Sequence, residues 1–161
     1  MTLEAVRRAA PADLARLTEL AELARQELST HKGGAVWAVR EGRRAPIEEG
    51  IAADLSAPER CVVVGEFDGY PVGYGVVRCE PTHDGGRLGV VSDLYVEPEF
   101  RGLGVGETMM LELVAWCEAQ GCRGVDSIAL PGDRDTKNFF ESFGLVARAI
   151  VVHRALGPRD G

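Results

Sequence analysis

The sequence predicts an α/β fold of the α+β kind, in which one mixed and mostly antiparallel central sheet is flanked by about four helices. Short valine-rich runs separated by glycine turns predict the antiparallel part of the sheet. Farther along the chain a strand, a long helix and a second strand follow one another with short links, which predicts one parallel pair. The 161 residues provide for one domain with a sizeable core. We expect that domain at residues 1–156, followed by a flexible tail at 157–161.

The first third of the chain is expected to be mainly helical. Residues 3–9 predict a short strand, and Pro11 then favours a helix start. Leucine and alanine recur at three- and four-residue spacing over residues 14–28, as they do on the buried face of a helix. The glycines at 33–34 are expected to end this helix. Residues 46–55 predict a second, shorter helix.

Two strands joined by a tight turn are expected next, with a third strand beside them. Residues 61–67 are rich in valine, and Asp68 and Gly69 supply the positive-φ pair that a hairpin turn requires before a strand at 72–79. Residues 89–96 carry little charge and predict the third strand. These strands form the antiparallel part of the sheet.

A long helix then connects two parallel strands. Residues 107–120 contain an apolar face, and Gly121 stands where a C-terminal cap is expected. Residues 125–130 predict a short strand. Because the connection is a helix with short links, this strand is expected to lie parallel to the strand at 89–96.

The C-terminal part predicts one more helix and a closing strand. Asp133 is a suitable N-cap for a helix at 134–143, and Gly144 is expected to stop it. A closing strand is expected at 145–154, directly after this helix.

Composition excludes several classes of protein. The formal net charge of −7 leaves no basic field to hold a phosphate backbone, so nucleic-acid binding is not expected. No stretch approaches the roughly 18 uninterrupted apolar residues of a membrane span, and we expect a cytoplasmic protein without membrane contact. The histidines and cysteines show no metal-ligand spacing, so no metal is expected and the thiols should be reduced. The cysteines are Cys61, Cys79, Cys117 and Cys122.

A glycine-rich loop between the strand at 89–96 and the long helix carries the main chemical signal. The first N–H groups of a helix are unpaired, and glycines let an anion approach them without meeting a Cβ. Arg101 adds a fixed positive charge that can bind phosphate oxygens in a forked geometry. The loop therefore predicts a pyrophosphate site, although a purely structural turn can show the same glycine spacing. Its glycines are Gly102, Gly104 and Gly106.

Two other nucleotide-binding motifs do not match. No Gly-Lys-Ser or Gly-Lys-Thr ending is present, which excludes a P-loop. Asp126 stands at about the distance expected of a ribose-binding carboxylate, but it begins its strand instead of ending it, and the third glycine of the dinucleotide motif is missing. A dinucleotide-dependent enzyme is therefore the weaker interpretation.

Two segments resemble the GNAT superfamily of N-acetyltransferases. Arg101-x-x-Gly104-x-Gly106 matches its Arg/Gln-x-x-Gly-x-Gly/Ala signature, and Leu94-Tyr95-Val96-Glu97-Pro98 is similar to the strand that normally precedes it. The segment Phe139-Phe140-Glu141-Ser142-Phe143-Gly144-Leu145 resembles the later Phe/Leu-Tyr-Glu-Lys-x-Gly-Phe segment. The similarity extends from about residue 61 to 154 in element order, which implies the GNAT-like sheet with one parallel pair.

The resemblance implies acetyl-CoA as co-substrate and a set of residues that bind it. Backbone N–H groups from 103 to 107 would bind the pyrophosphate, and the backbone of the preceding strand would pair with the pantetheine arm. Asp133 stands where the family often has asparagine, and we expect it to cap the helix. Phe140 stands where many members have the tyrosine that protonates the thiolate, so turnover should be slower. The implied set is Leu94, Val96, Arg101, Gly102, Leu103, Gly104, Val105, Gly106, Glu107, Asp133 and Phe140.

A general base is needed because an alkyl amine must lose a proton before it attacks, at a cost of roughly 4 to 5 kcal/mol at pH 7. Asp93 is the candidate, since it is the only acidic residue within its strand and several relatives carry a substrate-facing acid there. A solvated or paired surface acid is the alternative role. Ser92 would hold a relay water, Glu97 is the weaker choice of base, and Val96 N–H would polarise the thioester carbonyl.

The expected function is direct transfer of acetyl from acetyl-CoA to a primary amine, carried by a small molecule or a peptide. A non-catalytic acyl-CoA sensor is the alternative. The resemblance is compatible with a homodimer. Residues 28–58, where the acceptor would bind, contain no motif that identifies the amine.

Overall fold

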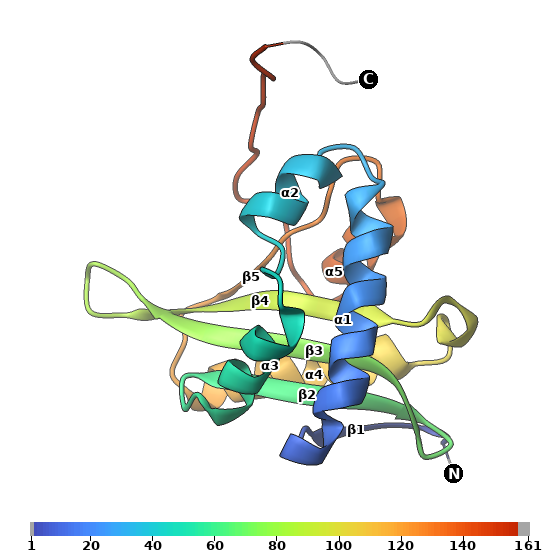
Figure 1. Ribbon diagram of the computed structural model, residues 1–161. Coiled ribbons are helices and arrows are strands. Elements are labelled where there is room, and N and C mark those ends of the chain that lie inside the picture. Colours follow the sequence, from blue (N-terminus) through green and yellow to red (C-terminus); the bar gives the residue numbers. More distant parts are fainter. Residues whose placement is uncertain (1, 158–161) are drawn as a thin grey trace.

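The computed structural model describes residues 2–157, and Figure 1 shows their arrangement. The elements in chain order are β1 (Glu4–Arg8), η1 (Pro11–Asp13), α1 (Leu14–Ser29), α2 (Gly34–Arg40), α3 (Ile47–Ser56), β2 (Arg60–Phe67), β3 (Tyr70–Pro81), β4 (Arg87–Val96), η2 (Pro98–Phe100), α4 (Val105–Ala119), β5 (Val125–Ser127) and α5 (Arg134–Ser142).

The five strands form one sheet in the order β1-β2-β3-β4-β5. Neighbouring strands are antiparallel except β4 and β5, which are parallel. The hairpin between β2 and β3 turns at Asp68 and Gly69, whose φ angles are 50° and 80°, as the tight turn requires. The predicted mixed and mostly antiparallel sheet with one parallel pair is confirmed.

Helices cover both faces of the sheet. In Figure 1, α1 and α3 lie in front of the strands and α4 lies behind them. The valines of β2 alternate between the two layers: Val63 packs with α4, whereas Val62 and Val64 pack with α1 and α3. Burial on both faces explains why this strand is a nearly continuous apolar run.

The helix α2 was missing from the sequence prediction. Helix α1 ends at Ser29, and Gly33, with a φ angle of 78°, is the N-cap of α2 and not the end of α1. A Cβ at Gly34 would lie 2.2 Å from Leu28 O, so glycine is required for the close approach of the two helices. The chain therefore has five α-helices within residues 2–157, one more than about four.

The predicted closing strand at 145–154 is wrong. Residues 145–156 have no regular structure, and the side chains of Val146 and Val151 are 78% and 87% exposed. A closing strand needs a neighbouring edge to which its backbone can bond. The neighbour would be β5, which pairs with β4 on its other side and is only three residues long, so it offers too short an edge for residues 145–154. Of the predicted tail, residues 158–161 lie outside the described residues.

The caps of the later helices agree with the sequence. Gly121 follows α4 with a φ angle of 74°, and Gly144 follows α5 with a φ angle of 81°. Both are left-handed values that favour glycine at a helix end. No helix within residues 2–157 combines the length and apolar character that crossing a membrane would take.

Candidate active site

A β-bulge in β4 lies at the centre of the candidate site. Val76 of β3 is opposite Asp93, whereas the next residue, Val77, is opposite Val91, so Ser92 has no partner in β3. An extra residue of this kind bends the strand and changes the edge toward which later N–H groups point.

Beyond the bulge, β4 has an open edge on the side of β5. The pairing with β5 ends at Val91. Glu97 N–H donates to Val72 O of β3 at 2.9 Å. Because successive N–H groups alternate between the edges of a strand, those of Leu94 and Val96 point away from β3. A bound chain could pair with them as an added strand.

The loop after β4 presents a row of backbone N–H groups. Gly102 and Gly104 have φ angles of 79° and 91°, which glycine adopts without the penalty of a Cβ. The first internal bond of α4 runs from Thr108 N to Gly104 O at 3.1 Å. Within the described part of the chain, no N–H group of residues 102–107 has a protein acceptor. These groups, together with the N-terminus of α4, are suited to bind an anion.

Arg101 holds the loop in place and is itself held by protein groups. Its Nε donates to Val96 O at 2.8 Å, and its terminal nitrogens donate to the Glu27 carboxylate of α1 at 2.8 and 2.9 Å. Its Cζ lies 5.5 Å from the centre of the Tyr95 ring. The hydrogen bonds to Glu27 raise the pKa of Arg101 above its usual range. An anion bound in the loop would share this guanidinium with Glu27.

Helix α5 packs against the loop. A Cβ at Gly106 would lie 3.3 Å from the Phe139 ring, so the two helices meet closely at this glycine. Phe140 is 8% exposed and belongs to the apolar core on the α4 side of the sheet. The Asp133 carboxylate accepts bonds from Thr136 N at 3.2 Å and Thr136 Oγ1 at 2.7 Å. The expected capping role of Asp133 is confirmed.

Asp93 is bound by three side chains. Tyr74 OH and Ser92 Oγ each donate to its carboxylate at 2.6 Å, and Arg43 donates through Nε at 2.7 Å and Nη2 at 3.0 Å. The Asp93 side chain is only 9% exposed. Ser92 is exposed, so a molecule outside the protein can contact its hydroxyl, which in turn is hydrogen-bonded to the Asp93 carboxylate.

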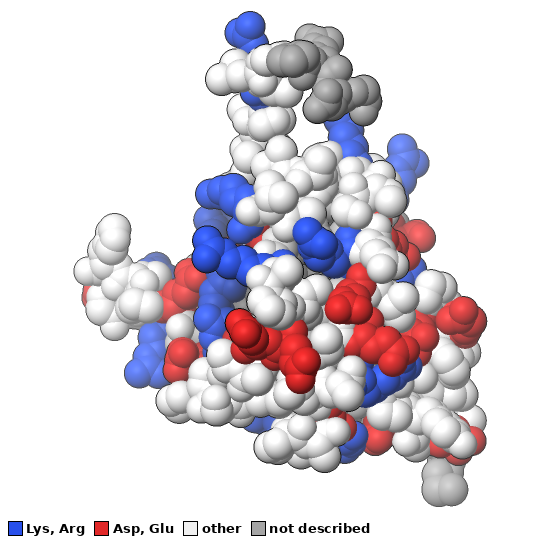
Figure 2. Space-filling view, in the orientation of Figure 1, with Lys and Arg blue, Asp and Glu red and all other residues white. Residues whose placement is uncertain are grey.

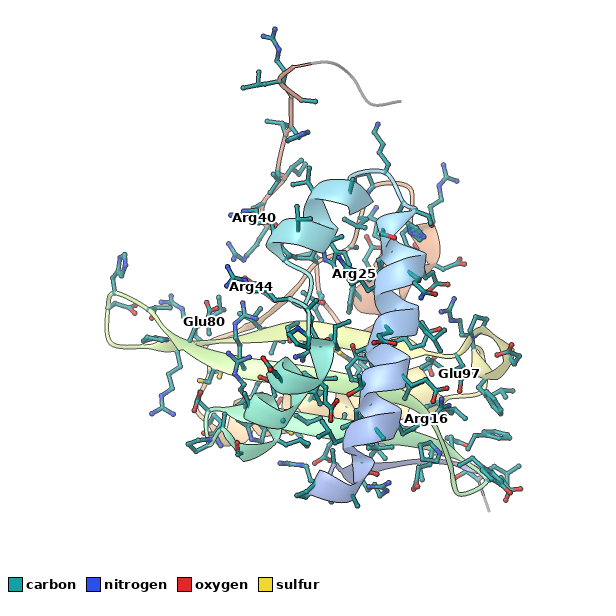
Figure 3. The ribbon with its side chains drawn as sticks, viewed as in Figure 1. Arg16, Arg25, Arg40, Arg44, Glu80 and Glu97 are labelled. Atoms are coloured by element: carbon teal, nitrogen blue, oxygen red, sulfur yellow. The ribbon has the colours of Figure 1, made fainter. Side chains whose placement is uncertain are left out.

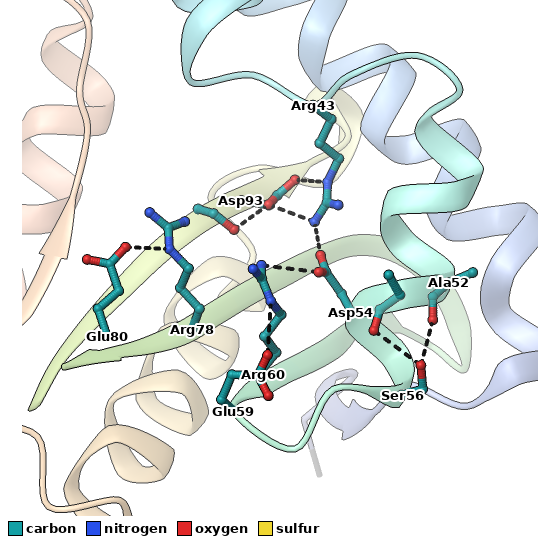
Figure 4. Close-up of polar contacts among 11 residues, drawn as sticks. Arg43, Ala52, Asp54, Ser56, Glu59, Arg60, Arg78, Glu80 and Asp93 are labelled. Atoms are coloured by element: carbon teal, nitrogen blue, oxygen red, sulfur yellow. Dashed lines mark hydrogen bonds and ion pairs between the residues drawn. The ribbon is translucent and has the colours of Figure 1, made fainter.

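Arg43 connects Asp93 to a second buried acid. Its Nη2 also donates to Asp54 at 2.6 Å, and Arg60 lies 3.1 Å from the other Asp54 oxygen (Figure 4). Burial lowers the pKa of Arg43, but the charges of the two acids outweigh burial and raise it above its usual range. Burial, followed by the charge of Asp93, raises the pKa of Tyr74 well above its usual value, so the phenol keeps its proton.

Sequence reasoning missed Arg43 and Asp54 and left Tyr74 unassigned. The bonds that bring these residues together join positions 50, 19 and 11 residues apart. No local pattern marks such contacts, because they depend on how α3 and the loop before it pack on the sheet. Glu97, the weaker candidate base, is instead paired with Arg16 near the start of α1 (Figure 3).

A cavity of about 170 Å³ adjoins the Asp93 network. It lies between α1, α2, the loop that follows α2, and the strands β3 and β4. Trp37 lines it, as do Ser92 and Leu94 of β4. A molecule in this cavity would therefore lie next to the open edge of β4. Among the described residues, no three His, Cys, Asp or Glu side chains are grouped so as to hold a metal ion.

The site features agree with a family match over most of the chain. Residues 17–145 match the acetyltransferase (GNAT) family. The chain belongs to this family. The resemblance based on the loop at 101–106 and the segment at 139–145 is thereby confirmed. In this GNAT protein, the bulged strand and the glycine loop lie within the matched residues.

Relatives of known name support the same assignment. The aminoglycoside N(6')-acetyltransferase type 1 of Stenotrophomonas maltophilia is 31% identical over 87 residues, which are 51% of this chain and 56% of that protein. The chain thus covers little more than half of this relative.

Solved structures share the fold. The aminoglycoside N-acetyltransferase AAC(6')-Iy in complex with CoA has a TM-score of 0.71 at 16% identity, covering 96% of this chain and 95% of that chain. Glucosamine-6-phosphate N-acetyltransferase from Arabidopsis thaliana has a TM-score of 0.68 at 20% identity, covering 96% and 99%. The names of these two proteins state different acceptors, so the fold by itself does not select the amine.

Proposed function

We propose that this protein transfers the acetyl group of acetyl-CoA to a primary amine by direct attack of the amine. The observation that carries the proposal is the open edge of β4, which has the unpaired loop N–H groups at one end and the cavity at Ser92 beside it. Family membership and the acetyltransferase relatives support the same reaction. Bound acetyl-CoA would supply the activated acetyl group.

The residues of the loop suit the carrier. Free N–H groups and the partial positive charge of a helix N-terminus are the usual protein partners of a diphosphate. The N–H groups from Leu103 to Glu107 would bind it. The backbone of Leu94 and Val96 would pair with the pantetheine arm, while Arg101 holds the loop through its bond to Val96 O.

The chain also provides a path for the proton of the acceptor amine. The Ser92 hydroxyl accepts that proton and passes its own to Asp93, whose carboxylate is 2.6 Å away. Arg43 and Tyr74 position the carboxylate, and their hydrogen bonds keep it next to Ser92. The Val96 N–H on the open edge would donate to the thioester carbonyl as that oxygen gains charge.

Phe140 has no proton to give to a leaving thiolate. A thiol has an ordinary pKa of about 8.5, so the thiolate leaves acceptably at neutral pH and solvent protonates it. We therefore assign Phe140 a packing role against α4 and assign Asp133 to capping α5, which holds Phe139 over the loop.

Binding of the carrier is tested by calorimetry with CoA. We expect Gly104→Glu to weaken CoA binding by about a hundredfold or more, because it adds a carboxylate and a Cβ at a φ angle of 91° inside the anion site. Gly121→Glu is the matched control. Gly121 also has a left-handed φ angle, 74°, with open space around it, but it lies at the other end of α4. Equal loss of binding in the two variants, or none in either, would refute the assignment of the loop.

Turnover is tested by thiol release with a panel of amines. The panel includes amino acids, amino-sugar phosphates, neutral amino sugars, polyamines, aminoglycosides and a peptide N-terminus. Release with any acceptor supports the enzyme. Binding of CoA without release from any acceptor would instead support a sensor, the alternative that Phe140 and the fully bonded Asp93 favour.

A further inference from the structure

The cavity beside β4 is lined by more arginines than acids. Its charged residues come from α1, from the loop after α2, from α3, and from strands β2, β3 and β4, and Figure 4 shows several of them on one side of the sheet. The basic residues are Arg25, Arg43, Arg60 and Arg78, and the acidic residues are Glu41, Asp54 and Asp93.

The acids of the cavity are already engaged. Asp93 accepts bonds from Arg43, Tyr74 and Ser92, and Asp54 is paired with Arg43 and Arg60. The side chains of Asp93 and Asp54 are only 9% and 8% exposed, so these protein partners, and not solvent, compensate their charges.

The remaining acid of the cavity is engaged as well. Glu41 is paired with Arg40 at 2.5 Å. A cationic group that entered the cavity would therefore meet no uncompensated carboxylate there.

Two of the arginines have donors to spare. Arg25 makes no salt bridge or side-chain hydrogen bond with any described residue. Arg78 is paired only through Nε, which donates to Glu80 at 2.8 Å. Its terminal nitrogens have no partner among residues 2–157. Glu80 does not line the cavity. The cavity thus offers two guanidinium groups with unpaired donors that can bind an anion, and Arg forks match carboxylate and phosphate oxygens.

The surface around the cavity continues this charge pattern. Figure 2 shows Lys and Arg side chains gathered over α2 and the loop that follows it, and Figure 3 places Arg25, Arg40 and Arg44 on that side. Carboxylates gather farther down, over α1 and α3. A second hollow there is lined by Glu22 and Glu48 and shares Arg25 with the cavity, but no residue of β4 lines it. A polycation held in that hollow would not contact the residues around the bulge.

We infer that the acceptor of this protein is an amine that also carries an anionic group, a carboxylate or a phosphate, which Arg25 and Arg78 bind. The inference rests on the proposed function, since it assigns the cavity beside Ser92 to the acceptor. The anion lies against α1 and β3, and the amine faces the hydroxyl of Ser92 and the open edge of β4.

Matched acceptors test the inference. Thiol release is measured for glucosamine 6-phosphate against glucosamine, and for 4-aminobutyrate against 4-aminobutanamide, with a polyamine and an aminoglycoside as cationic acceptors. We expect the highest kcat/KM for an anionic acceptor, and the two pairs distinguish phosphate from carboxylate. A highest value for a neutral or cationic acceptor would overturn the inference and leave the acetyltransferase intact. If no thiol is released with any of these acceptors, nor with any amine of the wider panel, the proposed function itself is overturned.

Variants of the two arginines provide the second readout. Arg25→Gln and Arg78→Gln should each lower kcat/KM for the anionic acceptor by about tenfold or more, the scale of one charge-assisted hydrogen bond, and leave its neutral partner within about twofold. Arg123→Gln is the control, because it removes the same charge from a pair with Asp84 in which both side chains are 61% exposed. Equal losses for the anionic and neutral acceptors would contradict the assigned role, and CoA affinity should stay unchanged in all three variants.

Discussion

The two halves of the candidate site are built in different ways. The half that we assign to CoA, at residues 94–107, is called the CoA half. It consists of backbone groups: glycines with left-handed φ angles, unpaired N–H groups and an open strand edge. The half that we assign to the acceptor, between α1, α3 and the sheet, is called the acceptor half and consists of side chains that reach one another from separate elements. The first half depends on neighbours in sequence, and the second depends on tertiary packing.

This difference has consequences for both stability and specificity. Backbone N–H groups bind any diphosphate in the same way, so the CoA half can be shared by a family whose acceptors differ. The acceptor half keeps two acids and an arginine largely out of water. Such a group is stable only while every charge is paired, because removing one partner leaves an uncompensated buried charge.

The largest expected effect comes from breaking the buried pairs. We expect Arg43→Met to lower the free energy of unfolding by about 3–5 kcal/mol, because Asp54 and Asp93 lose their shared partner. Urea unfolding measures the loss. The exposed pair of Arg123 and Asp84 is the comparison, and Arg123→Gln should cost less than about 1 kcal/mol. Similar losses in the two variants would show that the acceptor half is not held by its buried charges.

A smaller effect is expected from two thiols in the core between the sheet and α4. Burial raises the pKa of Cys61 from 9.0 to about 11 and that of Cys117 from 9.0 to about 12. The unfolded chain therefore releases these protons first, so folding stability is complete below about pH 9 and falls as the pH rises toward the folded values. Between pH 8 and 10 the wild type should lose about 1–2 kcal/mol that the Cys61→Ala, Cys117→Ala double variant does not lose.

Urea unfolding at each pH checks this difference in slope. Val63→Ala is the matched control, since it removes a fully buried side chain from the same core cluster without removing a titrating group. It should keep the wild-type slope between pH 8 and 10. A double variant with that same slope would contradict the role of the thiols.

The smallest expected effect concerns a local feature near the CoA half. Asp133→Ala should destabilise the protein by about 1 kcal/mol, because the first turn of α5 loses its cap, whereas Asp133→Asn should cost only a few tenths. Thermal unfolding measures both. If Asp133→Asn destabilised the protein as much as Asp133→Ala, the attraction between the charges of Asp133 and Arg101 would contribute more to stability than the cap.

Much of the fold followed from short-range patterns. The hairpin at Asp68 and Gly69, the caps at Gly121 and Gly144, and the parallel strand after α4 are all features of a few neighbouring residues. The closing strand expected at 145–154 is wrong for the opposite reason. Apolar residues suit a strand, but a strand forms only beside a neighbouring edge, and β5 is a short strand that pairs only with β4.

The candidate site divides in the same way. The loop at 101–107 and the capping role of Asp133 could be inferred from sequence, and Ser92 and Asp93 could be named as candidates. What Asp93 contacts could not be inferred, because Arg43 and Tyr74 are 50 and 19 residues away. The bulge at Ser92, which opens the edge of β4, is likewise visible only in the register between strands.

The glycine loop, the order of most elements and the resemblance to the acetyltransferase family could be read from the sequence, since they depend on backbone conformations that a few adjacent residues set. Which charges meet in the cavity beside β4, and which of its arginines keep unpaired donors, depends on the packing of distant segments. Glycine acts on its own φ angle and on the N–H groups beside it, whereas a buried carboxylate takes its properties from whichever segments the fold brings against it.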